Sequence, residues 1–255
     1  MNRTKIDWVK GMTWNPMVGC SPASEGCANC YAKAMAMRFV GFFEPQFYSE
    51  RLPEPWYRRK PTNIFAGSMT DIFHTAFDKQ RIFAVLDVIQ RCPQHTFVIL
   101  TKRADRMLDI MGDFYDCYEA SSVLNIPPLP NLYLGVSVEN AAHVDRIPIL
   151  LDILAAKHIV SFEPLIGDVG DISEWLVSRE EIAPYSSPTN PEWRRIPALN
   201  WCIVGVETGP GARPMDYAWA RDIRDQCAAA NVPFWFKSGK QPIPEDLNIK
   251  QTILS

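Results

Sequence analysis

The sequence lacks any long hydrophobic run. No stretch reaches the roughly 18 apolar residues that a membrane-spanning helix needs, although 47% of the residues are hydrophobic. The first residues, MNRTKIDWVKGM, also lack the apolar core of a signal peptide. We therefore expect a protein that has no membrane partner and works in the cytoplasm.

An excess of positive charge is also missing. The chain has 26 lysines and arginines against 29 aspartates and glutamates, and its net charge is −3. This balance argues against a protein that coats nucleic acid electrostatically. The sequence shows no internal repeat, low-complexity tract or clear domain boundary. We therefore expect residues 1–255 to form a single domain with one large core.

Cysteine is sparse outside one short segment. Four of the seven cysteines stand singly and read as reduced, buried thiols: Cys92, Cys117, Cys202 and Cys227. The other three, Cys20, Cys27 and Cys30, share one loop. A structural zinc ion takes four protein ligands, and a cubane cluster normally takes four cysteines. A loop with three cysteines therefore predicts a 4Fe–4S cluster with one iron left open for a small molecule.

Short apolar runs alternate with helical patterns from residue 62 onward. The runs cover 63–71, 96–103, 132–140, 158–165, 200–209 and 233–238, with a weaker run at 12–17. Apolar residues recur at helical spacing over 78–92, 103–111, 140–156 and 216–230. Asp78, Asn140 and Asp216 are expected to cap the helices that begin there. This alternation predicts an α/β fold, a partial or complete β/α (TIM-like) barrel. A doubly wound open sheet would show much the same pattern. The Pro-rich stretches 112–131 and 178–198 are expected to be irregular insertions.

Polar residues cluster where the expected strands end. Four of these positions carry carboxylates, Asp71, Glu139, Glu163 and Glu207, and two carry lysines, Lys102 and Lys237. In a β/α barrel the chemistry lies at the carboxyl ends of the strands. The acidic and basic side chains are therefore expected to form one rim around a ligand site.

The segments that carry these residues resemble those of the radical S-adenosylmethionine superfamily. The chain is more closely similar to an uncharacterised, bacteriophage-associated family of radical-SAM-like proteins. The matching segments are TWNPMVGC, GCANCYA, FAGSMTDIF, LTKRADRM, LGVSVEN, SFEPLIG, IVGVETGPGARPM and PFWFKSGK. The common superfamily spacing is C-x3-C-x2-C, whereas this chain has C-x6-C-x2-C. The resemblance spans nearly the whole chain.

The resemblance implies a cofactor and residues to hold it. Cys20, Cys27 and Cys30 would bind three irons of a 4Fe–4S cluster, and S-adenosylmethionine would chelate the fourth. The cofactor would also contact strand-end residues: Gly67, Ser68, Thr70, Asp71, Lys102, Ser137, Glu139, Glu163, Glu207 and Lys237. Lys33 and Arg38 would offset the charge of the cluster. The implied reaction is cleavage of the cofactor to a 5′-deoxyadenosyl radical, with flavodoxin or ferredoxin as the electron donor.

The substrate is the least determined part of this interpretation. The phage association favours a nucleic-acid base or a nucleotide, and it would place the chain in the host cytoplasm. The aromatic and basic stretch 56–60, with Arg194, Arg195 and Arg213, could supply phosphate contacts. Three alternatives remain: a structural zinc site, a non-catalytic barrel protein, and a hydrolase that uses Glu139 and Glu207 as paired carboxylates.

Overall fold

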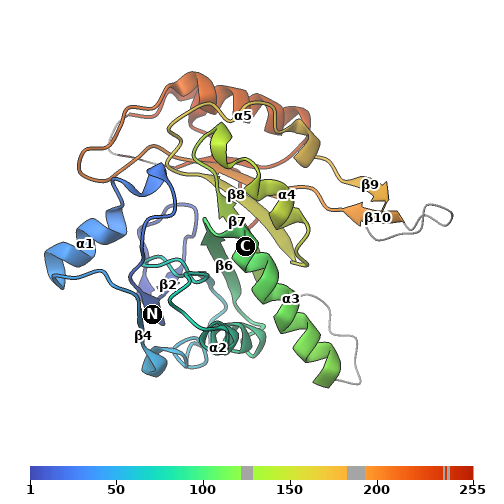
Figure 1. Cartoon of the computed structure of the whole chain (residues 1–255). Coiled ribbons are helices and arrows are strands. Elements are labelled where there is room, and N and C mark those ends of the chain that lie inside the picture. The colour runs from blue at the N-terminus through green and yellow to red at the C-terminus, as the bar shows by residue number, and fades with distance from the viewer. Residues whose placement is uncertain (122–128, 183–192, 238, 240–241, 255) are drawn as a thin grey trace.

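One eight-stranded sheet organises the computed structural model, which describes residues 1–121, 129–182, 193–237, 239 and 242–254. The strands lie across the sheet in chain order: β1 (Asn2–Arg3), β2 (Met12–Trp14), β5 (Asn63–Ala66), β6 (Thr96–Thr101), β7 (Leu132–Ser137), β8 (Lys157–Phe162), β11 (Trp201–Val204) and β12 (Phe234–Phe236). From β2 to β12 all neighbours pair in parallel, and β1 is antiparallel to β2. The fold is therefore mixed α/β with a mostly parallel sheet (Figure 1).

The described sheet is open rather than closed. Strands β1 and β12 are its two edges, and no pairing between described residues joins them. The parallel strands are nevertheless buried on both sides, as their unbroken apolar runs predict: every residue of β5, β11 and β12 is buried. The α/β prediction is confirmed, whereas a complete TIM-like barrel is not what the described residues form.

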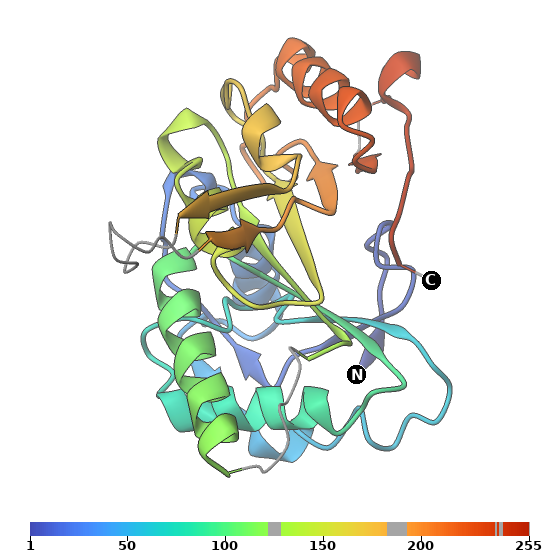
Figure 2. The same cartoon turned by 90° about the vertical axis from the view of Figure 1, so that its right-hand side faces the viewer.

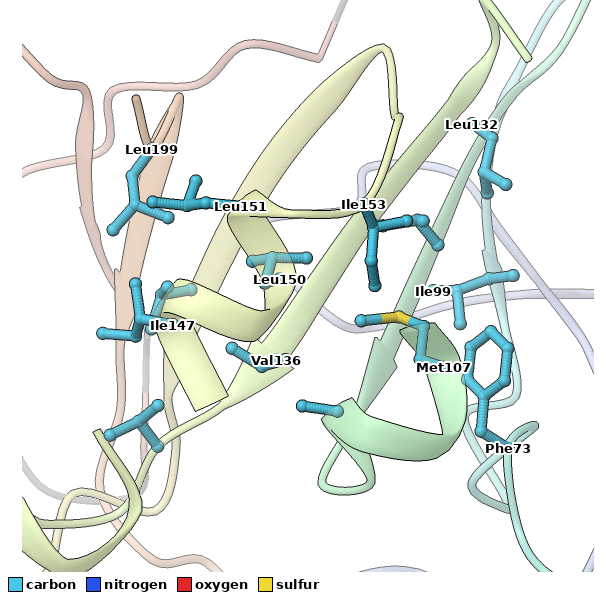
Figure 3. Packing of buried hydrophobic residues seen from close by; sticks show 14 of the residues in the cluster. Phe73, Ile99, Met107, Leu132, Val136, Ile147, Leu150, Leu151, Ile153 and Leu199 are labelled. Atoms are coloured by element: carbon cyan, nitrogen blue, oxygen red, sulfur yellow. The ribbon is translucent and has the colours of Figure 1, made fainter. Parts of the chain in front are cut away.

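Four helices pack on one face of this sheet. They are α2 (Lys79–Gln90), α3 (Ala104–Ser121), α4 (Arg146–Leu151) and α5 (Tyr217–Ala229). Their buried residues join the main core cluster with the residues of the strands that point the same way. Figure 3 shows Met107 of α3 in the same layer as Ile99 of β6, and Ile147 and Leu150 of α4 near Val136 of β7. Each helix buries an apolar stripe against the sheet.

The opposite face of the sheet is covered by aromatic side chains from both ends of the chain. A second core cluster contains Trp8, Phe65, Trp201 and Trp235. The indole Nε1 of Trp201 donates to the Gln251 carbonyl at 2.9 Å, so the C-terminal segment lies against this face. Figure 2 shows the two ends of the chain approaching each other there. This aromatic layer fills the space below the pocket described in the next section.

The predicted helix starts are largely confirmed. Asp78 caps α2 by accepting from Arg81 N, and Asp216 caps α5 by accepting from Ala218 N. The expected helix over 140–156 is wrong in its extent. Asn140 caps only a short 3₁₀ turn, η3 (Ala141–His143), and α4 starts at Arg146, which leaves Pro148 in its first turn.

The two expected irregular insertions contain regular structure. Helix α3 continues through the first of them to Ser121, and 122–128 lie outside the described residues. In the second, β9 (Arg179–Ile182) and β10 (Trp193–Ile196) pair as antiparallel strands on either side of 183–192, which are also outside the description. Proline content indicated loops, but helical and strand patterns continue into both stretches. In the described part of the chain, every helix is too short or too polar to cross a bilayer.

Candidate active site

A pocket lies at the carboxyl ends of the parallel strands and has a volume of about 200 Å³. Ligands of parallel sheets bind at this end, where the loops that follow the strands converge. All the residues expected at the site except Glu139 line the pocket: Cys20, Cys27, Cys30, Gly67, Ser68, Thr70, Asp71, Lys102, Ser137, Glu163, Glu207 and Lys237. The strand-end residues therefore lie around one cavity.

Asp71 is held by the chain itself. It follows the turn after β5, where Gly67 has a φ of +84° that favours glycine. Its Oδ1 accepts from Phe73 N at 3.0 Å and from the Thr101 hydroxyl at 2.7 Å. Its Oδ2 accepts from the backbone N of Lys102 at 3.1 Å. These donors use most of the hydrogen-bonding capacity of the carboxylate, so Asp71 fixes the ends of β5 and β6 relative to each other.

Arg103 completes this arrangement and connects it to the first cysteine. Its Nη1 lies 2.8 Å from Asp71 Oδ2 and 3.8 Å from Cys20 Sγ. Burial raises the pKa of the Cys20 thiol, the Asp71 charge raises it further, and Arg103 partly opposes both. The thiol of Cys20 therefore stays protonated more readily than an exposed cysteine.

Glu139 lies directly behind the pocket wall. It is completely buried, and its Oε2 accepts from Arg146 Nη1 at 2.8 Å. Its Oε1 is paired with Lys102 Nζ and hydrogen-bonded by the Ser24 hydroxyl. Burial alone would raise the pKa of Glu139, but Lys102, Ser24 and Arg146 together lower it. Glu139 is thus an ionised carboxylate that holds Lys102 at the pocket.

The far side of the pocket is built by β8, β11 and the segments after them. Glu163 forms an ion pair with Lys237, and both side chains line the cavity. Ser137 and Ser161 also line it, and they are register partners on the neighbouring strands β7 and β8. Side chains on one face of paired strands lie next to each other, so this wall presents two adjacent hydroxyl groups.

Glu207 anchors the loop after β11. Its Oε1 lies 2.5 Å from Arg213 Nη2, and its Oε2 accepts from Asn29 Nδ2 at 2.9 Å. The hydrogen bond from Arg213 outweighs the effect of burial and lowers the pKa of Glu207 to about 2. Asn29 lies between Cys27 and Cys30, so Glu207 connects the cysteine loop to the sheet.

The cysteine segment, defined here as residues 20–30, is tethered along its length across the strand ends. At its start, the Ser21 hydroxyl lies 2.7 Å from His74 Nε2. At its middle, Glu25 accepts from Asn140 Nδ2 at 2.5 Å and lies 2.9 Å from His143 Nε2. The hydrogen bonds from His143 and Asn140 lower the pKa of Glu25 to about 2. The segment therefore forms a fixed roof over one side of the pocket.

The predicted iron–sulfur cluster is contradicted by the arrangement of this roof. Among the described residues, no three histidine, cysteine, aspartate or glutamate side chains are grouped to hold a metal ion. The sulfur atoms contact their own surroundings instead: Cys20 Sγ faces Arg103 and the Ser21 carbonyl, and Cys27 Sγ accepts from Ala23 N at 3.5 Å. The chain between Cys20 and Cys27 runs into the 3₁₀ turn η1 (Glu25–Cys27), so sequence proximity does not bring the thiols together.

The predicted cofactors are therefore wrong: the described residues offer no group that would hold a 4Fe–4S cluster with S-adenosylmethionine chelated to it. The expected electron donor, flavodoxin or ferredoxin, stays a prediction. Lys33 and Arg38, expected to offset the cluster charge, are exposed on α1 (Tyr31–Phe39) and do not line the pocket. The zinc alternative requires the same missing ligand group.

Several functional neighbours were not expected from the sequence. Arg103 and Arg146 neutralise the carboxylates of the site, and the sequence assigned a role to neither, although Arg103 ends one of the polar strand ends. Trp8 lines the floor of the pocket although it comes from the turn before β2. Of the expected phosphate contacts, Arg213 lies at the rim, whereas the stretch 56–60 does not line the pocket and Arg194 pairs with Glu181 on the separate β9–β10 sheet.

The comparisons with known proteins identify one family. The model of a family described as "Protein of unknown function (DUF5131)" matches residues 3–248, which is nearly the whole chain. The expected membership of the radical S-adenosylmethionine superfamily is therefore wrong, because the family that matches is a different one. No curated protein and no solved structure matches the chain.

Proposed function

We propose that this chain, which belongs to the DUF5131 family of proteins of unknown function, is an enzyme that acts on a nucleic-acid base or a nucleotide. The observation that carries the proposal is the convergence of three cysteines and six charged side chains on one cavity of about 200 Å³. A cavity of about 150 Å³ holds benzene. The pocket therefore has room for a heterocyclic ring and for polar groups attached to it.

The charges of the pocket favour the base as the part that is enclosed. Its lining contains three carboxylates, Asp71, Glu163 and Glu207, and three cations, Lys102, Arg103 and Lys237. Their formal charges sum to zero, and Asp71–Arg103 and Glu163–Lys237 are paired with each other. A phosphate would have to displace a carboxylate from its cation, whereas an uncharged base would not. We therefore place the base inside and any phosphate outside.

Stability alone does not account for so many charges at one cavity. A buried ion pair often contributes no more stability than apolar residues of the same volume. Glu139 is fully buried and nevertheless kept ionised by Lys102, Arg146 and Ser24, which contact it at the pocket wall. Such arrangements are typical of sites that hold fixed charges for chemistry.

The thiols of Cys27 and Cys30 are the groups proposed to react, because the raised pKa of Cys20 keeps that thiol protonated. Cys20, Cys27 and Cys30 are partly exposed and line the pocket, whereas the carboxyl groups are committed to ion pairs. The pKa of Glu207 is about 2 and that of Glu139 is lowered, so neither is protonated at neutral pH. General-acid hydrolysis needs a carboxyl group that carries a proton. The structure therefore favours thiol chemistry over the hydrolase alternative.

We also propose an architecture and a cellular location for the protein. We interpret the open sheet as a partial barrel, because α2 to α5 pack on one face and the aromatic cluster covers the other. A doubly wound sheet would have helices on both faces. We also place the chain in the cytoplasm, because no disulfide joins two of the described cysteines, which suits a reducing compartment.

Protection of the cysteines from alkylation tests the proposed function. The protein is treated with iodoacetamide in the presence of adenine, guanine, cytosine, uracil or hypoxanthine, and of the matching nucleosides and nucleotides. Labelling of each cysteine is followed by mass spectrometry. We expect at least one compound to slow labelling of Cys27 and Cys30 several-fold. Cys117, exposed on α3 and absent from the pocket lining, is the internal control and should label at the same rate.

The same samples show whether the bound compound is altered. Reaction of the protecting compound should produce a change of mass that is abolished in a Cys27→Ser, Cys30→Ser double variant. If none of the bases, nucleosides or nucleotides protects the two thiols, the proposed function is wrong.

A further inference from the structure

The aromatic and basic stretch 56–60 forms an exposed surface away from the pocket. Trp56 and Tyr57 are 46% and 80% exposed, although rings of this size are buried for the most part in folded proteins. Arg59 and Lys60, which follow them closely, are exposed as well. Two large rings and two cations therefore face solvent within one short segment.

This surface lies at the end of the sheet opposite the pocket. Thr62 follows the stretch, and its carbonyl accepts from Thr96 N at 3.2 Å, where β5 and β6 begin. The pocket lies where the same strands end, and no residue of 56–60 lines it. A molecule bound to this surface therefore makes contacts that are separate from those of the pocket.

The backbone that carries the two rings is fixed by turns. Trp56 N donates to the Pro53 carbonyl at 3.0 Å. Arg58 N donates to the Pro55 carbonyl at 3.2 Å, and the same carbonyl lies 3.2 Å from Nε2 of the buried His95. The prolines restrict the chain further, because their φ is fixed. The rings are thus held at the surface before a partner arrives, which lowers the entropic cost of binding.

The cations of this surface are available to a negatively charged partner. Among the described residues, neither Arg59 nor Lys60 forms an ion pair. Glu54, the carboxylate nearest to them in the sequence, lies 2.5 Å from the amino group of Met1 instead. The next acidic residue along the chain is Asp71, which lines the pocket. The stretch is therefore locally positive, although the net charge of the chain is −3.

Exposed rings beside cations are the combination that binds single-stranded nucleic acid. Each base has a flat face that stacks on an aromatic ring, and the phosphates pair with lysine and arginine. A duplex would also pair with the cations, but its bases are already stacked on one another. An acidic protein segment would pair with them too, but such segments contain few aromatic rings. A single strand is the partner that uses both the rings and the charges.

We propose that the surface formed by Trp56, Tyr57, Arg59 and Lys60 binds single-stranded nucleic acid, with bases stacked on the two rings and phosphates paired with the two cations. The contact should tolerate different sequences, because every base has a face that can stack. This inference goes beyond the proposed function, since the pocket encloses one base and this surface holds a strand at the other end of the sheet.

Binding of a labelled oligonucleotide tests the stacking contacts. The full chain is titrated against fluorescein-labelled, twelve-nucleotide oligo-dT, and binding is followed by fluorescence anisotropy. We expect the single strand to bind more tightly than a duplex of the same length. Tyr57→Ala should weaken binding at least about fivefold. Tyr57→Phe, which keeps the ring, should bind within about twofold of the unchanged protein.

The salt dependence of the same binding tests the cations. The logarithm of the affinity for a single strand falls with the logarithm of the salt concentration, with a slope of about −0.7 per neutralised phosphate. The Arg59→Ala, Lys60→Ala double variant should therefore reduce this slope by about 1.4 between about 50 and 200 mM NaCl.

The matched controls lie on α1. Phe39 is 72% exposed there, and Lys33 and Arg38 are exposed as well. Phe39→Ala and a Lys33→Ala, Arg38→Ala double variant should leave the affinity within about twofold and the slope unchanged.

Four results would overturn this inference. They are absence of binding by the unchanged protein, tighter binding of the duplex, full binding by Tyr57→Ala, and equal losses in the α1 variants. Displacement of the oligonucleotide by poly-glutamate as readily as by unlabelled oligo-dT would overturn it too, because the surface would then select negative charge alone. None of these results affects the protection of Cys27 and Cys30, so the proposed function stands or fails separately.

Discussion

At the scale of single residues, the carboxylates that line the pocket also bind neighbouring parts of the protein and hold them together. Asp71 accepts four hydrogen bonds, from Phe73, Thr101, Lys102 and Arg103, at distances between 2.7 and 3.1 Å. The carboxylate therefore connects the turn after β5 with the end of β6. Its charge also balances that of Arg103, which is only partly exposed to solvent.

Replacing Asp71 with asparagine should destabilise the protein markedly. The substitution leaves the Arg103 guanidinium without its anionic partner, and breaking a buried ion pair in this way costs about 3 to 5 kcal/mol. Urea denaturation should show this loss in the free energy of unfolding. The control is Asp246→Asn, because Asp246 pairs with Arg221 and Arg224 at the exposed surface, and it should leave the unfolding midpoint almost unchanged. Similar midpoints for both variants would contradict the organising role of Asp71.

At the scale of elements, the cysteine segment acts as a roof that is attached to the sheet through side chains. Ser24, Glu25 and Asn29 connect it to β7 and β11 or to the segments that follow them. Gly26 lies against the Glu139–Lys102 pair so closely that a Cβ there would be 2.5 Å from Glu139 Cγ. The roof can therefore reach the strand ends only because this position has no side chain.

Replacing Gly26 with alanine should displace the cysteine segment from the pocket. The added methyl group meets a fully buried carboxylate rather than a flexible side chain, and overpacking of this kind costs about 1 to 3 kcal/mol. We expect a lower melting temperature and faster alkylation of Cys27 by iodoacetamide. Unchanged alkylation of Cys27 would show that the roof does not depend on this contact.

The same substitution at Gly112 is expected to stabilise the protein. Gly112 lies within α3, and apart from its chain neighbours and the backbone of its own helix no described atom is within 4 Å of an added Cβ. Alanine has a higher helix propensity than glycine by up to about 1 kcal/mol. Gly112→Ala should therefore raise the melting temperature slightly and leave the labelling of Cys27 unchanged.

At the scale of the whole molecule, buried histidines and paired carboxylates act in the same direction as the pH falls. Burial lowers the pKa of His95 and His158 from the ordinary value of 6.5, and burial with Arg103 lowers that of His74. The unfolded chain therefore takes up protons near pH 6.5 that the folded chain takes up only at lower pH. The pKa of Glu207, about 2, extends this difference into the acidic range.

Stability should therefore decrease as the pH is lowered below about 6.5. For each proton that only the unfolded chain binds, the free energy of unfolding falls by about 1.4 kcal/mol per pH unit. As the pH falls from 4.5 towards 2, the stability that ionised Glu207 contributes should also be lost. Denaturation curves between pH 8 and 4 measure this slope. We expect the His158→Gln variant to give a shallower slope between pH 6.5 and 5, because glutamine cannot take up a proton at this position. An unchanged slope would contradict the assignment of this effect to His158.

Much of the fold followed from local patterns in the chain. Unbroken apolar runs predicted the parallel strands, and the capping residues Asp78 and Asp216 predicted where α2 and α5 begin. The strand-end residues also lie together around the pocket, because carboxyl ends of parallel strands meet at one edge. These features depend on backbone geometry and on neighbours close in sequence, so the sequence alone could determine them.

Side-chain partners across the fold were decided only by the tertiary structure. The spacing of Cys20, Cys27 and Cys30 suggested a shared metal, but the path of the loop and its tethers orient each thiol separately. Whether the sheet closes depends on pairing between its distant edges. Trp8 reached the pocket floor because packing on Phe65 and Trp201 carries it there. Contacts between residues far apart in the chain follow from how the whole core packs, and no local pattern encodes them.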